Sequence, residues 1–162
     1  GDFALSGINL EVADGEYFVL LGRSGSGKTC LLELIAGLHI PDSGSVWIDR
    51  HDITHSRIQD RPVGLVFQDF AIFPNMTVSG NIGYPLRSRR RKKEEISATV
   101  DAIAAEMGIS SILDRYPHNL SAGELQRVAL ARTLVLNPRL LHPFLHCTLD
   151  CHVRHMMPAH LA

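Results

Sequence analysis

The apolar positions of the first third of the chain fall into short runs that predict strands and one helix. Polar and apolar residues alternate over residues 8–12, whereas residues 17–21 (YFVLL) are continuously apolar, the pattern of a buried strand. Residues 30–36 (CLLELIA) predict a helix that ends at Gly37. Residues 46–48 and 63–67 predict two further short strands.

Two longer helical patterns occupy the second half. Ile96, Val100, Ile103 and Met107 follow spacings of four, three and four, which places them on one face of a helix. A further helix is expected over residues 125–136, because Ser121 and Glu124 have the S-x-x-E spacing of a capping box. Strands that alternate with helices predict an α/β fold with a mostly parallel sheet.

Charge and cysteine content narrow the class of protein. The 16 basic and 17 acidic residues nearly cancel, so the net charge gives no reason to expect a nucleic-acid partner. Three cysteines without framework spacing favour a reducing compartment over a secreted, disulfide-linked protein. No apolar run approaches the ~18–20 residues of a membrane span, and the first residues lack the pattern of a secretory signal.

The strongest motif lies between the predicted buried strand and the first predicted helix. It matches G-x-x-x-x-G-K-[ST] in full, with Gly22, Arg23, Ser24, Gly25, Ser26, Gly27, Lys28 and Thr29, followed by Cys30. Glycines let backbone N–H groups turn toward phosphate oxygens, and the following helix directs its positive end at the same anion. Lys28 is expected to reach the β- and γ-phosphates of ATP, and the Thr29 hydroxyl to ligate Mg²⁺. The alternative is a flexible Gly/Ser loop.

A second motif carries a family resemblance. LSAGELQRVALARTL, residues 120–134, resembles the signature helix of ABC transporter ATP-binding subunits, usually LSGGQ-x-QRVA-x-ARAL. In that family a second subunit presents this segment to the γ-phosphate, a role that the resemblance gives to Ser121, Gly123 and Glu124. Ala122 departs from the usual glycine. Without the phosphate loop, the same residues would be an ordinary capped helix.

A third segment is similar to the glutamine loop of ABC importers. Residues 66–69 (VFQD) precede AIFPNMTV, where importers commonly have VFQ-x-x-x-LFPHMTV. The resemblance implies that Gln68 senses Mg²⁺ and the attacking water. Residues 76–119 would then form a helical subdomain that docks on a membrane subunit.

The resemblance implies a single ATP-binding domain, residues 1–162, with a P-loop core at residues 1–75 and 120–162. It would be truncated at its C-terminal end. The implied partners are a second nucleotide-binding subunit, in the simplest case another copy of this chain, and a transmembrane permease. The implied location is cytoplasmic, on the inner face of the cell membrane. Among importers, the molybdate, tungstate and sulfate group gives the nearest resemblance, ahead of polyamine and iron(III) importers.

Three features depart from the family. Relatives continue after the segment matching residues 137–141 with a strand that ends in Asp-Glu, but no acidic residue lies between Glu124 and Asp150. The switch histidine is expected beyond Ala162, and Phe3 is a candidate for the aromatic residue that stacks on adenine. Since the acidic pair anchors the metal and orients water, we expect ATP binding with weak or absent hydrolysis.

Several alternatives remain open from the sequence. The chain could be a degenerate, non-hydrolysing nucleotide-binding module or a remnant of a transporter gene. It could also be a different P-loop enzyme such as a kinase or GTPase. The basic run over residues 87–93 (RSRRRKK) is expected to be a solvated helix face or loop. The alternative is a contact with anionic lipid or with a partner. Cys147 and Cys151, with His146, His152 and His155, offer zinc ligands but match no common spacing.

Overall fold

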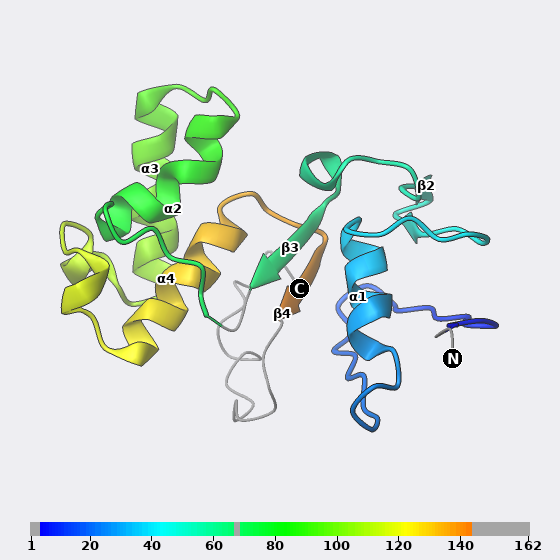
Figure 1. Ribbon diagram of the computed structural model, residues 1–162. Helices are drawn as coiled ribbons and strands as arrows, with labels where there is room; N and C mark the ends of the chain where they lie inside the picture. Colours follow the sequence, from blue (N-terminus) through cyan, green and yellow to red (C-terminus); the bar gives the residue numbers. More distant parts are fainter. Residues whose placement is uncertain (1–3, 67–68, 144–162) are drawn as a thin grey trace. The chain divides into compact units, whose positions relative to one another are not determined.

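The computed structural model describes residues 4–66 and 69–143 (Figure 1). The chain forms two compact units, one ending at Arg61 and the other beginning at Pro62. Each unit contains one of the two main predicted motifs. The first contains the phosphate loop, and the second contains the signature helix.

In the first unit, helix α1 (Lys28–Ala36) follows directly on the glycine-rich loop. It ends at Gly37, whose φ of 87° lies in the left-handed region that glycine adopts without strain. Strands β1 (Trp47–Ile48) and β2 (His51–Asp52) pair antiparallel. The two residues between them both have positive φ, as a tight hairpin turn requires. The prediction of the first helix and of a strand at residues 46–48 is therefore confirmed.

The two predicted N-terminal strands are wrong. Residues 8–12 and 17–21 form no strand, and most of their apolar side chains are exposed, with Leu21 at 78% and Val19 at 54%. A strand is stable only when a neighbouring strand satisfies its backbone and when one face is covered. No described segment pairs with either run, so apolar content alone does not produce a strand there.

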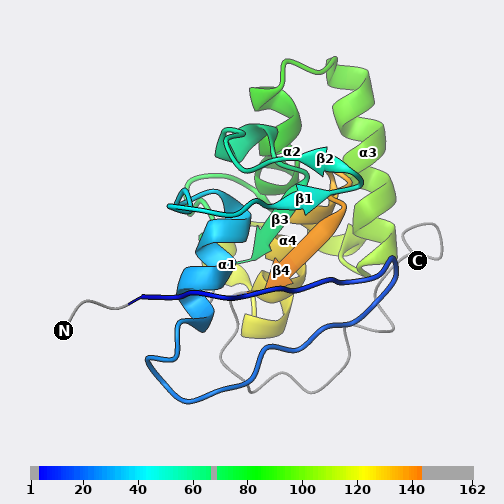
Figure 2. The ribbon, with the colours of Figure 1, turned by 90° about the vertical axis from the view of Figure 1, so that its right-hand side faces the viewer.

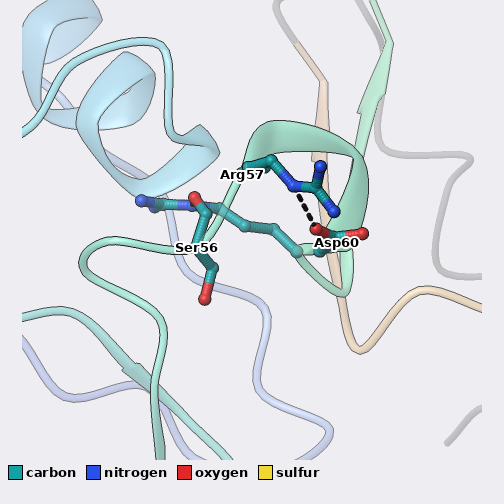
Figure 3. Close-up of polar contacts among 4 residues, drawn as sticks. Ser56, Arg57 and Asp60 are labelled. Atoms are coloured by element: carbon teal, nitrogen blue, oxygen red, sulfur yellow. Dashed lines mark hydrogen bonds and ion pairs between the residues drawn. The ribbon is translucent and has the colours of Figure 1, made fainter.

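A buried arginine holds the first unit together. Arg61 is 4% exposed and follows the short helix η1 (Ile58–Asp60), across which Arg57 and Asp60 form an exposed ion pair (Figure 3). The Arg61 guanidinium donates to four backbone carbonyls: those of Leu34 (3.0 Å), Ile35 (2.8 Å), Thr54 (2.8 Å) and Ser56 (3.2 Å). These bonds satisfy the free carbonyls at the end of α1 and tie them to the segment after β2.

The second unit combines a parallel strand pair with three main helices. Its elements are β3 (Val63–Val66), α2 (Val78–Ser88), α3 (Lys93–Glu106), η2 (Ser110–Ile112), η3 (Pro117–Asn119), α4 (Ala122–Leu134) and β4 (Leu140–Pro143). β3 and β4 lie side by side, with Val63 opposite Leu140 and Val66 opposite Pro143 (Figure 2). This pairing gives the α/β architecture that the sequence predicts.

Helix α4 packs closely on β3. A Cβ on Gly64 would lie 2.5 Å from the Thr133 methyl group, so only glycine permits this approach. The Thr133 hydroxyl donates to the Leu65 carbonyl at 3.2 Å. Fully buried side chains of α2 and α4, among them Ile82 and Val128, form the core between the helices.

Strand β4 ends at a proline. Pro143 is the last residue of β4 and lies opposite Val66. A proline is tolerated at the end of a strand because no further ladder bond needs its missing N–H. The strand register is thus kept up to the point at which the described chain ends.

Within residues 4–66 and 69–143, no helix is long and apolar enough to cross a membrane.

Candidate functional site

The phosphate-loop motif forms a tight turn before α1. Gly25 and Gly27 have φ values of 80° and 90°, conformations that side chains other than glycine rarely adopt. At Gly22, a Cβ would lie 2.9 Å from the Ser26 hydroxyl oxygen. Backbone conformation therefore favours glycine at positions 25 and 27, and at position 22 a larger residue would displace the Ser26 hydroxyl.

Lys28 folds its side chain back across this loop. Its ammonium group donates to the Gly22 carbonyl (2.8 Å), the Arg23 carbonyl (2.7 Å) and the Ser26 hydroxyl (3.3 Å). These three bonds use all the donors of an ammonium group. The lysine thus closes the loop, and an anion in the loop would compete with these oxygens for the same charge.

The start of α1 offers unused backbone donors. The first intrahelical bond from the loop runs from the Leu31 N–H to the Gly27 carbonyl at 2.9 Å. No acceptor in the described part of the chain meets the N–H groups of Lys28, Thr29 or Cys30, and the N-cap Gly27 has no side chain to supply one. Three N–H groups beside a cation, at the positive end of a helix, fit a phosphate group.

Thr29 is the residue of the loop that fits a metal. Its side chain lies on the exposed side of the first turn of α1. One hydroxyl does not make a metal site, and the described residues contain no group of three or more His, Cys, Asp or Glu that could hold an ion. Mg²⁺ keeps several waters and takes phosphate oxygens as ligands, so a single protein hydroxyl beside a nucleotide suits it. Gln68, the other predicted metal contact, lies outside the described residues.

The signature segment begins α4 with the predicted capping box. The Ser121 hydroxyl oxygen accepts from the Glu124 N–H at 3.3 Å, and the Glu124 carboxylate accepts from the Ser121 N–H at 2.8 Å. The Ser121 hydroxyl also donates to that carboxylate at 2.6 Å. The capping box predicted from the sequence is confirmed.

These bonds also set the charge of Glu124. Hydrogen bonds from Ser121 lower the pKa of the Glu124 carboxyl, and the positive charges of Arg115 and Arg127 add to the effect. The carboxylate is therefore ionised at neutral pH. The Nε–H of Arg127 itself is buried and meets no acceptor among residues 4–66 and 69–143.

Gly123 stands in open space between these two residues. Apart from its chain neighbours and the backbone of α4, no described atom lies within 4 Å of the position that its Cβ would occupy. Its φ is not in the left-handed region, because it belongs to the first turn of α4. Within the described residues, nothing therefore excludes a larger side chain at this position, whereas close approach of an outside group would do so.

The segment after the glutamine loop is held by two polar side chains that the sequence analysis did not identify. Asn81 is fully buried, and its carbonyl oxygen accepts from the Phe73 N–H at 2.8 Å. Its amide donates to the carbonyls of Phe73 (3.0 Å), Met76 (3.1 Å) and Thr77 (3.0 Å). A buried asparagine that bonds a loop on every side fixes the path of that loop.

Arg132 is the second of these side chains. It projects from α4 and donates to the carbonyls of Phe70 (2.9 Å) and Ala71 (2.7 Å). Its guanidinium also lies 5.3 Å from the centre of the Phe73 ring, and burial lowers its pKa. Arg132 thus connects the signature helix to the segment that follows Gln68. In the sequence, this role is indicated only by the position of Arg132 near the end of the LSAGELQRVALARTL segment.

The structure thus brings Lys28 together with Gly22 and Ser26, and Ser121 together with Glu124. The two groups belong to different units. Phe3 and Gln68 lie outside the described residues, as do the cysteines and histidines of the possible zinc cluster.

Known proteins resemble this chain over most of its length. The family model described as ABC transporter matches residues 5–142. The spermidine/putrescine import ATP-binding protein PotA of Nitrosomonas europaea is 46% identical over 142 residues, 87% of this chain and 39% of that protein. The sulfate/thiosulfate import ATP-binding protein CysA of Gloeobacter violaceus is 45% identical over 158 residues, 95% of this chain and 45% of that protein.

A solved structure agrees in fold. The structure of cbiO1 from Clostridium perfringens, part of the ABC transporter complex cbiONQ, is similar with a TM-score of 0.78 and 32% identity, over 86% of this chain and 57% of that one. The chain belongs to the ABC transporter family and has the fold of its ATP-binding domain. It spans less than half the length of the two import proteins.

Family membership confirms the resemblance seen in the sequence. The relatives do not point to one cargo. Their names include polyamines, sulfate and, for a protein of Bartonella bacilliformis, sn-glycerol-3-phosphate. The prediction of an oxyanion cargo therefore stays a prediction.

Proposed function

We propose that this chain is the ATP-binding part of an import transporter, in which it binds Mg²⁺-ATP at the loop of residues 22–29. The observation that carries the proposal is the start of α1. There three N–H groups that meet no acceptor in the described part of the chain, together with the Lys28 ammonium, adjoin a turn with positive φ at Gly25 and Gly27. Relatives that are import ATP-binding proteins support the transport role.

Each loop residue has a part in this proposal. The N–H groups of Lys28, Thr29 and Cys30 bind phosphate oxygens, and Gly22, Gly25 and Gly27 allow the turn. Lys28 exchanges the loop carbonyls for β- and γ-phosphate oxygens, and the Thr29 hydroxyl, with Gln68, holds Mg²⁺. Arg23, Ser24 and Ser26 contribute backbone around the phosphates. Mg²⁺ supplies neutralisation of the phosphate charge when it is bound.

The signature helix serves a second copy of the chain. In this proposal Ser121, Gly123 and Glu124 face the γ-phosphate of the partner, which places each nucleotide between two subunits. The open space around Gly123 supports this role, since a side chain at this position would meet no neighbouring element of the described chain. A transmembrane permease would receive residues 76–119 as the docking subdomain, with residues 1–75 and 120–162 as the ATP-binding core. The chain would then act at the inner face of the membrane.

The cargo is the least determined part. We propose import of a small oxyanion such as sulfate, molybdate or tungstate, supported by the similarity to a sulfate/thiosulfate import protein. Equal similarity to a spermidine/putrescine import protein makes polyamine uptake the competing outcome of a transport assay.

A second candidate is a nucleotide-binding module that does not hydrolyse ATP. It is favoured by one observation: no acidic residue follows Glu124 until Asp150. Without a carboxylate at the end of β4, nothing described in the chain orients the attacking water. The ATP-bound dimer would then persist, because its ATP would not be hydrolysed.

Gly123→Ala tests the proposal. The substitution adds one methyl group where the chain leaves space, so the monomer should fold and bind ATP as before. We expect Mg²⁺-ATP to drive wild-type dimerisation in analytical ultracentrifugation, and the variant to dimerise about tenfold more weakly or worse. Absence of an ATP-dependent dimer, or equal dimerisation of the variant, would overturn the two-subunit site.

A further inference from the structure

Two consecutive residues between β3 and α2 hold an unfavourable backbone conformation. Phe70 has a φ of 58° and Ala71 a φ of 44°, both in the left-handed region. There a Cβ lies too close to the following carbonyl oxygen, so residues other than glycine seldom adopt this conformation. Such strain persists only where other contacts fix the backbone, and it concentrates at functional and switching segments. The turn over residues 69–71 therefore depends on the contacts that hold it.

Arg132 holds this turn from helix α4. One guanidinium nitrogen donates to the Phe70 carbonyl (2.9 Å) and another to the Ala71 carbonyl (2.7 Å). A single planar group thus bonds the carbonyls of both strained residues. Arginine presents its N–H donors in a fixed fork, whereas a lysine offers one point charge and cannot reproduce paired bonds of this kind. The side chain of Arg132 is therefore specifically suited to keep the turn in its left-handed conformation.

The opposite end of the same helix carries the signature segment. Ser121 is the N-cap of α4, and Arg132 lies about three turns further along. The neighbouring Thr133 packs on β3, where Gly64 leaves space for its methyl group. A helix is a rigid element that carries energetic coupling between its two ends. A change in what holds α4 at Arg132 therefore alters how its first turn is presented.

We propose that Arg132 is a positioning residue through which the turn at Phe70 and Ala71 regulates the ATP-dependent pairing of subunits. This inference rests on the function proposed above, in which Ser121 and Gly123 face the γ-phosphate of a partner subunit. While Arg132 bonds both carbonyls, the turn and α4 keep one relative position. If the turn relaxes out of the left-handed region, the two carbonyls rotate away and the guanidinium loses both acceptors. The helix is then less firmly held, and the subunit pair is weaker by the free energy of that coupling.

Three variants of the full chain test the positioning role, and a fourth is the control. Arg132→Lys keeps the positive charge but loses the paired donors. Ala71→Gly keeps Arg132 and removes strain from the turn, and the double variant combines both changes. Val135→Ala is the control, because Val135 is buried at the C-cap of the same helix and its truncation lowers stability without removing a bond to the turn. Analytical ultracentrifugation with Mg²⁺-ATP gives the dimer dissociation constant, and thermal melts give the stability of each variant.

We expect Arg132→Lys to raise the dimer dissociation constant about tenfold, and Val135→Ala to change it by less than about threefold at a similar loss of stability. The double variant should pair at least about threefold more tightly than Arg132→Lys, because glycine adopts the left-handed conformation without steric cost. Ala71→Gly alone should pair as the wild type does.

Three results would overturn the inference while the wild type still pairs. They are unchanged pairing of Arg132→Lys, an equal loss in Val135→Ala, and a double variant that pairs no better than Arg132→Lys. The last two would show that Arg132 contributes only to general stability. If the wild type itself forms no ATP-dependent dimer, the proposed two-subunit site fails, and this inference fails with it.

Discussion

Gly37 and Arg61 meet at the end of α1 so closely that a Cβ on Gly37 would lie 2.4 Å from the Arg61 Nε. The glycine has a left-handed φ of 87°, and the arginine is buried with its guanidinium bonded to four carbonyls. Burial lowers the pKa of Arg61, yet its positive charge is kept by the carbonyls and by the dipole at the end of the helix. Nothing at position 37 but glycine leaves room for this arrangement.

Gly37→Ala should therefore lower the free energy of unfolding by more than backbone strain alone would. Gly44→Ala is the matched control, because Gly44 has a φ of 88° and no atom within 4 Å of its Cβ position. We expect the control to lower the free energy of unfolding by about 1–2 kcal/mol, and Gly37→Ala by about 2 kcal/mol more. Urea denaturation measures both. Equal losses would mean that Arg61 moves aside at no cost.

Asn81 should be the most sensitive polar residue of the second unit. Asn81→Ala leaves the Phe73 N–H without its acceptor and removes the two amide N–H donors shared among three carbonyls, so we expect a loss of about 2–4 kcal/mol in the free energy of unfolding. Asn75→Ala, at an exposed position of the same segment, should change it by less than about 0.5 kcal/mol. Similar losses in the two variants would contradict the role given to Asn81.

The capping box should make stability depend on pH. Hydrogen bonds from Ser121 lower the pKa of Glu124 below its ordinary value of 4.5, so the ionised form stabilises the fold. That contribution is complete above pH 4.5 and disappears as the pH falls through the lowered pKa. Glu124→Gln keeps an acceptor for Ser121 but does not titrate. Thermal melts from about pH 6 down to about pH 2 should show wild type losing stability relative to the variant as the pH falls. Parallel curves would exclude the effect.

Turnover is expected to be weak or absent even when ATP binds. No acidic residue lies between Glu124 and Asp150, and catalysis of phosphoryl transfer depends on a positioned water and on a metal that neutralises the phosphate charge. Phosphate release by the purified chain with Mg²⁺-ATP should not exceed that of Lys28→Ala. Sustained release that Lys28→Ala abolishes would show that another group replaces the acidic pair.

The sequence predicted the parts of this fold that local patterns determine. Helices α1, α3 and α4 follow from apolar spacing and caps, and the Ser121–Glu124 box was identified from two residues. The glycine-rich turn was likewise evident, since only glycine tolerates the φ values found at Gly25 and Gly27.

The missed features depend on distant contacts. The apolar runs at residues 8–12 and 17–21 have strand composition, but a strand needs a partner that composition does not reveal. Arg61, Asn81 and Arg132 are polar residues whose burial is offset by backbone carbonyls from other elements. No periodicity marks such residues, because the carbonyls that they bind become available only once helices and loops are in place.

Equilibrium binding of Mg²⁺-ATP tests the central claim most directly. Calorimetry compares the wild-type chain with Lys28→Ala, which removes the ammonium that spans the loop, and with Arg23→Ala, which removes an equal charge from the same loop but leaves the carbonyl that Lys28 uses. We expect wild type and Arg23→Ala to agree within about threefold, and Lys28→Ala to bind about tenfold more weakly or worse. No binding by wild type, or undiminished binding by Lys28→Ala, would contradict the account.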